Sequence, residues 1–311
     1  MEPDQPEVEK NSAPDERAEP SREPAKAAKP DTPLFPVVGV GASAGGLEAF
    51  TQLLSHLPTD IRMGFVLVQH LAPQHPSMLT ELLSRATKLP VTEVKEGMMV
   101  EAGHVYVIPS NTNIAILNST LRLMSRAPST APRLPIDYFL TSLASDRQSK
   151  AIGVILSGSA SDGTLGMKAI KAEGGITFAQ DEGSAKFDSM PRSAIAAGYV
   201  DFVLPPDEIA RELARIARHP YFTPGTPLEA ESEPKPGPDD LHKVFILLRS
   251  ATGVDFSHYK MSIINRCIVL HNMDVLSDYL DYLRDDRTEL QALYKDILIQ
   301  RHEFLPGAGE L

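Results

Sequence analysis

Five short apolar runs that alternate with helix-like segments are the feature that most constrains how this chain folds. The runs are continuous, without regular polar interruptions, which predicts strands covered on both faces. Strands that alternate with helices predict a parallel sheet with right-handed crossovers, and therefore an α/β fold. The expected strands cover residues 35–40, 64–69, 151–156, 175–179 and 201–204. The expected helices cover residues 46–57, 77–87, 163–173, 193–198 and 206–218.

The interval from residue 91 to residue 123 interrupts this alternation. It contains short stretches in which apolar and polar residues alternate, separated by turn-forming residues: GHVYVIP, NIAIL and TLRLM. Closely spaced stretches of this kind are typical of antiparallel hairpins. We therefore expect a doubly wound, mostly parallel sheet with antiparallel hairpins inserted in it or attached to it.

Two proline-rich segments divide the 311 residues of the chain. Residues 1–33 have almost no large apolar side chain, so they cannot bury enough surface to offset the entropy lost on ordering, and we expect a disordered tail. Residues 223–239 combine five prolines with several acidic residues, which predicts an extended linker. The α/β domain then covers residues 34–222, and residues 240–298 have the helical spacing of a small all-α domain.

Charge, cysteine content and hydropathy narrow the classes of function. A net charge of −11 argues against a general nucleic-acid binder, because phosphate contacts require an excess of Lys and Arg. One cysteine excludes an internal disulfide and fits a reducing compartment. No apolar run approaches the roughly 18 residues of a membrane span, and the acidic N-terminus does not resemble a signal peptide. We expect a cytoplasmic protein that does not insert into membranes.

Three polar side chains lie just past three of the expected strands, in the loops that follow them. Ser43 follows the first strand, His70 the second and Asp162 the third. Ligands of a parallel α/β sheet bind outside the carboxyl ends of its strands, so these side chains are expected on one rim. A hydroxyl, an imidazole and a carboxylate are the groups that an activated serine needs. We predict that Ser43 is the nucleophile of a serine esterase, that His70 is its base and that Asp162 orients the histidine.

Glycines surround the expected nucleophile in the stretch Gly-Val-Gly-Ala-Ser-Ala-Gly-Gly at residues 39–46. They allow a sharp turn from strand to helix and leave backbone N–H groups available to hold an oxyanion. We expect this support from the backbone of Ala44, Gly45 and Ser159. The predicted chemistry requires no cofactor and no metal ion.

The same loop also fits a dinucleotide-binding oxidoreductase, because residues 39–44 read G-x-G-x-x-A between a strand and a helix. Such a site requires an acidic residue at the end of the second strand to hold the ribose. This chain has Gln69 and His70 there and no carboxylate before Glu81, which favours the esterase. Each candidate also has an ordinary structural interpretation, such as a turn, a core histidine or a helix cap. A scaffold with an altered, inactive site is a third alternative.

Five stretches of the chain resemble, in order, the catalytic domain of CheB, the chemotaxis protein-glutamate methylesterase. They are VVGVGASAGGLEAF, FVLVQHLAPQHPSMLTELL, GHVYVIP, ILSGSASDGTLGMKAIKAEGG and FDSMPRSAIAAGYVDFVL. The resemblance implies hydrolysis of glutamate γ-methyl esters on methyl-accepting chemotaxis-type receptors, release of methanol, and often deamidation of receptor glutamines. It implies that the catalytic serine, histidine and aspartate are Ser43, His70 and Asp162. Two sites depart from the family pattern: Ala44 stands where the family often has Thr, and Ser159-Ala160 stands where it often has Met or Thr.

The segment at residues 240–298 resembles the helical N-terminal domain of CheR, the matching methyltransferase, and CheB–CheR fusions of this order are a recognised class. An arginine-rich helix helps CheR engage the receptor, but only Arg266 remains of that run here. A small bundle that merely packs is an equal alternative. The resemblance also implies a receiver domain before the esterase and a methyltransferase domain after residue 298. We expect neither domain in this chain, and therefore no control by phosphorylation within it. We also expect that residues 299–311 are an aberrant tail caused by a frameshift or a truncated gene model.

Overall fold

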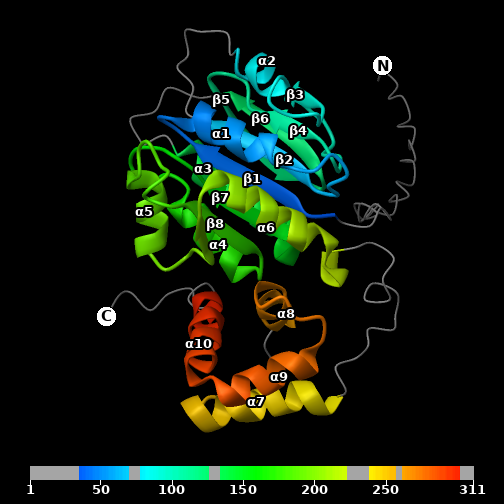
Figure 1. Cartoon of the computed structure of the whole chain (residues 1–311), viewed down its shortest axis with the longest axis vertical. Helices are drawn as coiled ribbons and strands as arrows, with labels where there is room; N and C mark the ends of the chain where they lie inside the picture. Colours follow the sequence, from blue (N-terminus) through cyan, green and yellow to red (C-terminus); the bar gives the residue numbers. More distant parts are fainter. Residues whose placement is uncertain (1–34, 70–77, 126–133, 223–237, 257–260, 302–311) are drawn as a thin grey trace, which may run out of the picture. The chain divides into compact units, whose positions relative to one another are not determined.

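A seven-stranded parallel sheet lies at the centre of the computed structural model, which describes residues 35–69, 78–125, 134–222, 238–256 and 261–301. The strand order is β3-β4-β2-β1-β7-β8-β9, so β1 lies at the centre, with β2, β4 and the edge strand β3 on one side and β7, β8 and β9 on the other (Figure 1). Neighbouring strands are parallel throughout. The strands are β1 (Val37–Ala42), β2 (Gly64–Gln69), β3 (Val91–Glu93), β4 (Val105–Val107), β7 (Ala151–Ile155), β8 (Ile176–Gln180) and β9 (Phe202–Leu204).

Helices cover both faces of this sheet, as the continuous apolar strands predict. One apolar core lies between the sheet and α1, α2 and α6, and the other lies between the sheet and α3, α4 and α5. The doubly wound α/β prediction is therefore confirmed. The helices are α1 (Gly46–Ser55), α2 (Leu79–Ser84), α3 (Pro135–Arg147), α4 (Thr164–Ala172), α5 (Ser189–Ala196) and α6 (Pro206–Arg218), with 3-10 turns at Gln148–Lys150 and Pro220–Phe222.

The expected antiparallel hairpins are only partly correct. One hairpin exists, formed by β5 (Thr112–Leu117) and β6 (Thr120–Ser125) as a separate two-stranded sheet. The preceding stretch GHVYVIP instead forms β4, a parallel strand whose three residues are all buried. Tyr106 made this stretch look like a strand with one polar face. Its hydroxyl forms hydrogen bonds with nearby backbone groups, so the side chain is buried all the same. It donates to the Met99 carbonyl at 3.0 Å and accepts from the Glu101 N–H at 3.0 Å while the ring is buried.

The helix before β9 begins earlier than expected. The predicted start was residue 193, whereas α5 runs from Ser189 to Ala196. Pro191 lies in its first turn, where proline costs no intrahelical hydrogen bond because the first N–H groups have no partner within the helix. Pro191 is therefore compatible with a helix that starts at Ser189.

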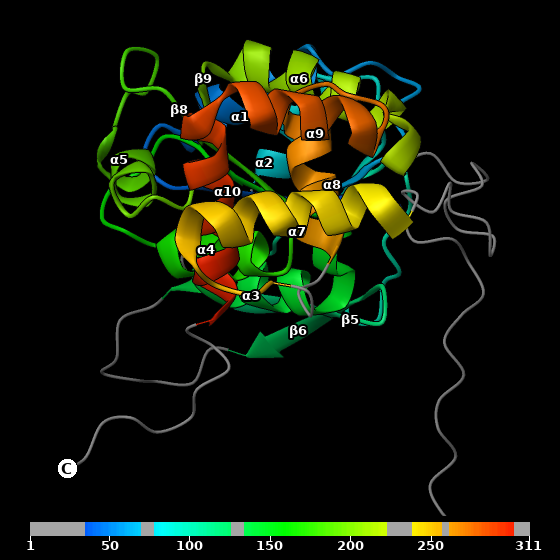
Figure 2. The same ribbon diagram turned by 90° about the horizontal axis from the view of Figure 1, so that it is seen from below.

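In the described residues that follow the α/β domain, the chain forms four helices, which confirms the predicted small all-α domain. They are α7 (Pro238–Thr252), α8 (Met261–Leu270), α9 (Leu276–Asp285) and α10 (Arg287–Arg301). They share their own apolar core, which includes Leu248, Phe256, Ile264 and Leu293. Helices α7 and α9 pack against each other and lie side by side (Figure 2). None of the helices in the described part of the chain is long and apolar enough to cross a membrane.

Candidate active site

The loops that follow β1 and β7 meet at one edge of the sheet, because these strands are neighbours in parallel register. Gly41 of β1 pairs with Ile155 of β7 on one side, and Ala42 of β1 pairs with Gln69 of β2 on the other. The residues immediately after these pairs therefore leave the sheet at the same level. This is the carboxyl edge, where α/β sheets bind their ligands.

Ser43 lies in the first of these loops, directly after β1, and its side chain is half-buried. Its backbone N–H donates to the Ser157 carbonyl at 3.0 Å. Its own carbonyl accepts from the Gly46 N–H at 3.0 Å and from Gln69 Nε2 at 3.3 Å. The backbone of the predicted nucleophile is therefore tied to both neighbouring strands.

Gly45 makes the sharp turn into α1 that the glycine-rich stretch predicts. Its φ of 75° lies in the left-handed region, where a side chain costs free energy. A Cβ at this position would lie 2.6 Å from Ser157 Oγ, so the turn also requires a residue without a side chain. The predicted sharp turn at the start of α1 is confirmed.

Ser157 connects three loops at this edge, and its side chain is buried. Its hydroxyl donates to the Ala44 carbonyl at 2.8 Å and accepts from the Phe187 N–H at 3.0 Å. Its backbone N–H donates to Gln180 Oε1, at the end of β8, at 2.9 Å. The hydrogen bonds of the Ser157 hydroxyl and of Gln180 were not predicted from the sequence. A signal was present for Gln180, because it directly follows the fourth expected run, which ends at residue 179.

Asp162 is buried and accepts two backbone hydrogen bonds at the start of α3. Its Oδ2 accepts from the Ile136 N–H at 3.0 Å, and its Oδ1 accepts from the Asp137 N–H at 2.9 Å. A carboxylate at this place stabilises the first turn of a helix through its N–H groups and dipole. Asp162 thus acts as a helix cap, which was its ordinary structural interpretation. It caps α3, however, and not the adjacent α4. Helix α3 itself was not predicted.

A second carboxylate lies next to Asp162. Asp137 accepts from the Gly166 N–H at 2.8 Å in the first turn of α4. Burial raises the pKa of Asp137, and the negative charge of Asp162 raises it further, whereas hydrogen bonds from Gly166 and its neighbours oppose the shift. The two carboxyl groups therefore fix the starts of α3 and α4 relative to each other.

The structure brings some of the predicted site residues together. The Ser43 loop contacts the turn after β7, where a Cβ placed on Gly158 would lie 3.1 Å from Ser43 Cβ. Ser159 is exposed in the same turn, and Ala160 adopts a left-handed φ of 68°. His70 lies outside the described residues, so its predicted place beside Ser43 stays a prediction. Its predecessor Gln69 ends β2 next to Ala42.

Exposed apolar side chains surround this edge of the sheet. Leu47 lies in the first turn of α1, Leu165 in the first turn of α4 and Phe187 just before α5.

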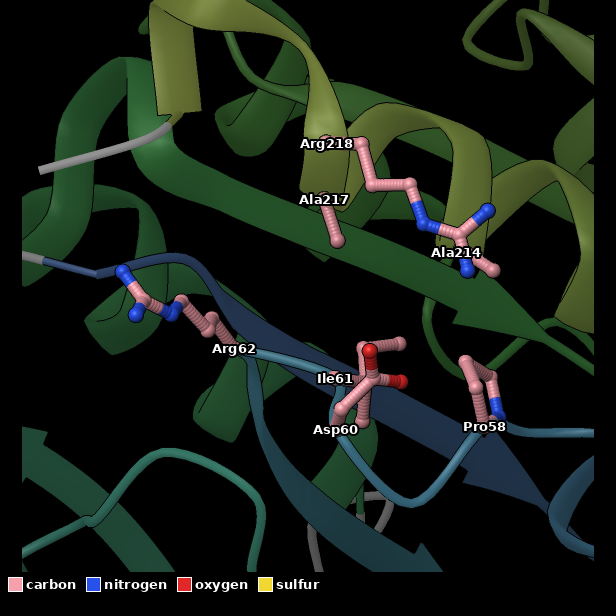
Figure 3. Close-up of a pocket in the computed structure, with 7 residues that line it drawn as sticks. All are labelled: Pro58, Asp60, Ile61, Arg62, Ala214, Ala217 and Arg218. Carbon is pink, nitrogen blue, oxygen red and sulfur yellow. The ribbon is translucent and has the colours of Figure 1, made fainter. Parts of the chain in front are cut away.

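A hollow of about 350 Å³ lies elsewhere, between the segment before β2 and the end of α6 (Figure 3). Asp60, Arg62 and Arg218 are its charged lining residues. The segment precedes the first residue of β2, so the hollow belongs to the amino edge of the sheet. It is separate from the edge that carries Ser43 and Asp162.

Comparison with protein-family models gives two matches. Residues 38–213 match the model described as CheB methylesterase, and residues 239–298 match the model described as CheR methyltransferase, all-alpha domain. The oxidoreductase alternative has no support in these matches.

Similar proteins carry related names. A Burkholderia orbicola protein named protein-glutamate methylesterase/protein-glutamine glutaminase 3 is 39% identical over 183 residues, which cover 58% of this chain and 54% of that protein. A Geobacter sulfurreducens protein named protein-glutamate methylesterase/protein-glutamine glutaminase 1 is 35% identical over 214 residues, 66% of this chain and 59% of that protein. The chain thus spans less than two thirds of the length of these relatives.

One solved structure and one longer protein complete the comparison. The catalytic domain of Thermotoga maritima CheB methylesterase superposes with a TM-score of 0.55 at 30% identity, covering 59% of this chain and 99% of that domain. An uncharacterized 104.1 kDa protein of Rhodobacter capsulatus is 35% identical over 246 residues, which cover 71% of this chain and 25% of that protein.

Proposed function

Because the chain belongs to the CheB methylesterase family, we propose that residues 34–222 hydrolyse glutamate γ-methyl esters on a chemoreceptor and release methanol. The observation that carries the proposal is the anchored loop after β1, where both the N–H and the carbonyl of Ser43 are held by neighbouring strand ends. An anchored turn keeps a nucleophile in one orientation, which lowers the entropy lost on reaching the transition state. Deamidation of receptor glutamines belongs to the same proposal, because the similar proteins are also named glutaminases.

The proposed reaction has two steps. Ser43 Oγ attacks the ester carbonyl carbon while His70 takes the hydroxyl proton, and Asp162 orients the imidazole. The intermediate collapses, His70 returns the proton to the departing oxygen, and methanol leaves an acyl-enzyme. Water, deprotonated by His70, then cleaves the acyl bond and leaves a glutamate carboxylate and a restored serine. The backbone of Ala44, Gly45 and Ser159 stabilises the oxyanion in both steps.

A receptor protein is the proposed substrate, and a cytoplasmic location belongs to the same proposal. Support comes from the exposed side chains of Leu47, Leu165 and Phe187, which offer an apolar contact surface next to Ser43. We further propose that residues 223–239 are a linker and that residues 240–298 are a separate helical domain, in agreement with the range of the second family match.

A methanol-release assay tests the function. The full chain is incubated with a receptor whose glutamates carry radiolabelled methyl esters, and volatile methanol is collected over time. We expect release well above that of a sample without protein, together with an equal loss of label from the receptor. A folded chain that releases no methanol from several methylated receptors would contradict the proposal and favour an inactive scaffold.

Replacing Ser157 with alanine is expected to lower kcat by about 10- to 100-fold and to leave KM almost unchanged. The change removes the hydroxyl that joins the Ala44 carbonyl to the Phe187 N–H, so the nucleophile loop loses its support while the substrate surface remains. Ser157→Thr keeps a hydroxyl and should restore most of the activity. Steady-state methanol release at several receptor concentrations separates kcat from KM.

Ser142→Ala is the matched control for this prediction. The Ser142 hydroxyl also bridges two backbone groups, since it donates to the Phe139 carbonyl at 2.7 Å and accepts from the Ile116 N–H at 3.0 Å. Ser142 lies in α3, and its hydroxyl contacts strand β5 of the hairpin, away from Ser43. The two variants should lose similar stability, about 0.5 to 1.5 kcal/mol per hydrogen bond, but only Ser157→Ala should lose activity. Equal kcat values in both variants would show that Ser157 does not position the nucleophile.

A further inference from the structure

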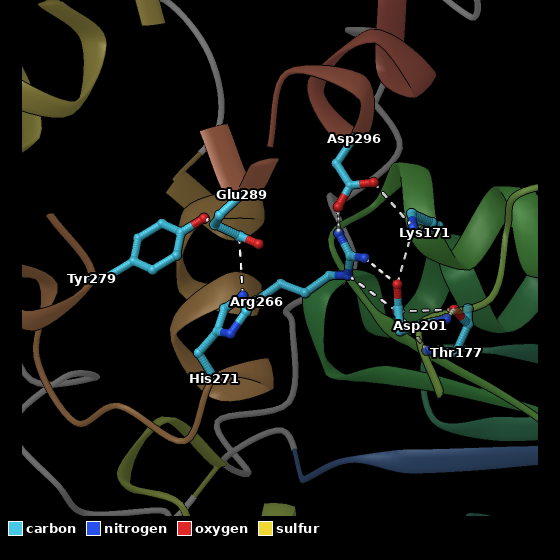
Figure 4. Close-up of polar contacts among 8 residues, drawn as sticks. All are labelled: Lys171, Thr177, Asp201, Arg266, His271, Tyr279, Glu289 and Asp296. Atoms are coloured by element: carbon cyan, nitrogen blue, oxygen red, sulfur yellow. Dashed lines mark hydrogen bonds and ion pairs between the residues drawn. The ribbon is translucent and has the colours of Figure 1, made fainter. Parts of the chain in front are cut away.

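Four charged side chains form a closed cluster between the α/β domain and the helical domain (Figure 4). Lys171 and Asp201 come from the α/β domain, and Arg266 and Asp296 come from α8 and α10. Lys171 Nζ lies 3.0 Å from Asp201 Oδ1 and 3.0 Å from Asp296 Oδ1. The Arg266 guanidinium pairs with Asp201, and its Nη1 lies 2.7 Å from Asp296 Oδ2. Each charge thus contacts two charges of opposite sign.

The cluster is buried as well as closed. The exposed fractions of the side chains of Arg266, Asp201, Lys171 and Asp296 are 1%, 3%, 9% and 14%. Burying a charge costs free energy unless it is paired and its remaining hydrogen-bonding positions are filled. The two positive and two negative charges balance. Asp201 Oδ2 also accepts from the N–H of Thr177 at 3.0 Å and from its hydroxyl at 2.9 Å.

Asp201 is ionised in this setting. Burial alone would raise the pKa of Asp201, but the charges of Arg266 and Lys171 outweigh burial and hold the pKa below its ordinary value. If Arg266 of α8 moved away, the Asp201 carboxylate would lose this stabilisation and the free energy of the domain contact would rise. The paired charges therefore favour the arrangement in which α8 stays in contact with the α/β domain.

Contacts around the cluster come from the same edge of the sheet. Asp201 directly precedes β9, and Gly174 precedes β8. A Cβ on Gly174 would lie 2.8 Å from Ser262 Cβ, so the first turn of α8 approaches this backbone closely. Val269 of α8 belongs to the apolar core formed by the sheet, α1 and α6. Helix α8 thus contributes both a charge and an apolar side chain to the α/β domain.

The end of α6 provides a second set of contacts. Arg215 Nη1 donates to Asn272 Oδ1 at 2.8 Å, and its Nη2 donates to the Val269 carbonyl at 3.1 Å. His219 Nε2 lies 2.8 Å from the Met273 carbonyl. These bonds cap the end of α8 and hold the turn that follows it. They are independent of the four-charge cluster but join the same two domains.

From these contacts we infer that the face of α8 around Arg266 is a permanent docking surface for the amino edge of the sheet within the same chain. The face is occupied internally, so it does not serve a separate partner such as a receptor. Ser43 and Asp162 lie at the opposite ends of the strands, so the docked helices leave the candidate active site uncovered. The inference does not depend on the proposed catalytic activity, and its test does not measure activity.

Hydrogen–deuterium exchange of the full chain, read by mass spectrometry, tests the docking. In Asp201→Asn and in Arg266→Met, we expect peptides around residues 174–177, 199–203 and 261–270 to exchange at least about tenfold faster than in the unchanged chain. The double variant should exchange no faster than the faster single variant, because both changes break the same contact. Peptides of β1 should stay protected in all variants.

Arg249→Met is the control within the helical domain. It removes an exposed ion pair with Asp255, whose atoms are 3.8 Å apart, and exposed pairs contribute little. Its exchange pattern should match that of the unchanged chain. Unchanged exchange at residues 199–203 in both Asp201→Asn and Arg266→Met would overturn the inference, as would effects that simply add in the double variant.

Cys267 separates undocking from unfolding of the helical domain. It is the only cysteine of the chain and lies in the core of the helical domain. Burial raises the pKa of its thiol to about 12, so it reacts slowly with a thiol reagent while that core is intact. Slow labelling together with fast exchange at residues 199–203 identifies undocking of a folded domain. Fast labelling in Asp201→Asn would also support docking, because a change in the α/β domain would then unfold the helical one.

Discussion

Replacing Ser43 with alanine is expected to lower methanol release from a methylated receptor by at least about 10⁴-fold. The change removes the hydroxyl of the proposed nucleophile, so the acyl-enzyme route is lost. The fold should survive, because the hydrogen bonds that anchor the loop use the backbone of Ser43. The free energy of unfolding, measured with urea, should therefore change by less than about 1 kcal/mol.

Ser55→Ala is the matched control in the same helix-and-loop unit. Ser55 ends α1, is exposed, and its hydroxyl donates to the Gln52 carbonyl at 3.0 Å. This variant should release methanol at the rate of the unchanged chain. If Ser43→Ala kept that rate too, the hydroxyl of Ser43 would not be the nucleophile, although the family membership of the chain would be unaffected.

Replacing Asp162 with asparagine is expected to have two separate effects. Methanol release should fall by about 10³- to 10⁴-fold, because a neutral amide neither fixes the histidine tautomer nor stabilises its charged form. The free energy of unfolding should also fall by about 1 to 3 kcal/mol. Asparagine has only one acceptor oxygen for the N–H groups of Ile136 and Asp137, so one of them loses its charged partner. The two effects are measured by the same assay and urea titration.

Asp286→Asn serves as the control because Asp286 also caps a helix with a carboxylate. Its Oδ1 accepts from the Thr288 N–H at 2.7 Å and from the Glu289 N–H at 3.3 Å at the start of α10. These hydrogen bonds lower the pKa of Asp286, as expected for a capping carboxylate. Asparagine keeps the one oxygen that both N–H groups use, so this variant should lose only the contribution of the negative charge to stability and should keep its activity. Should Asp162→Asn behave in the same way, Asp162 would be a structural cap only.

The sheet could be predicted from the sequence because its central strands are buried on both faces. A run such as residues 64–69 is without a polar side chain until its last residue, Gln69, and the structure gives β2 the same bounds. Helix α3 could not be predicted in this way. It packs between β1, α4 and the hairpin strand β5, so its buried residues do not form one stripe. They also include Asp137 and Arg147, which weaken the apolar periodicity on which helix prediction depends.

The candidate site likewise has residues that could be predicted from local sequence and residues that could not. Ser43 and Asp162 could be selected because they lie in the loops that follow two buried strands, β1 and β7. The role of Ser157 could not be deduced, because its partners Ala44, Phe187 and Gln180 are distant in the sequence and meet only through the register of three parallel strands. The position of Arg266 in the domain contact is equally long-range. Its partner Asp201 lies 65 residues away and gives no local signal.

The central strand β1 also acts as a spacer. Its six residues extend about 20 Å from the start of the strand to Ser43, since each residue of a strand adds about 3.3 Å. The helices docked at one end of the sheet and the proposed receptor substrate at the other end therefore do not compete for room. Substitutions that tune one end need not disturb the other, so substrate preference and domain attachment are free to evolve as independent traits of the same sheet.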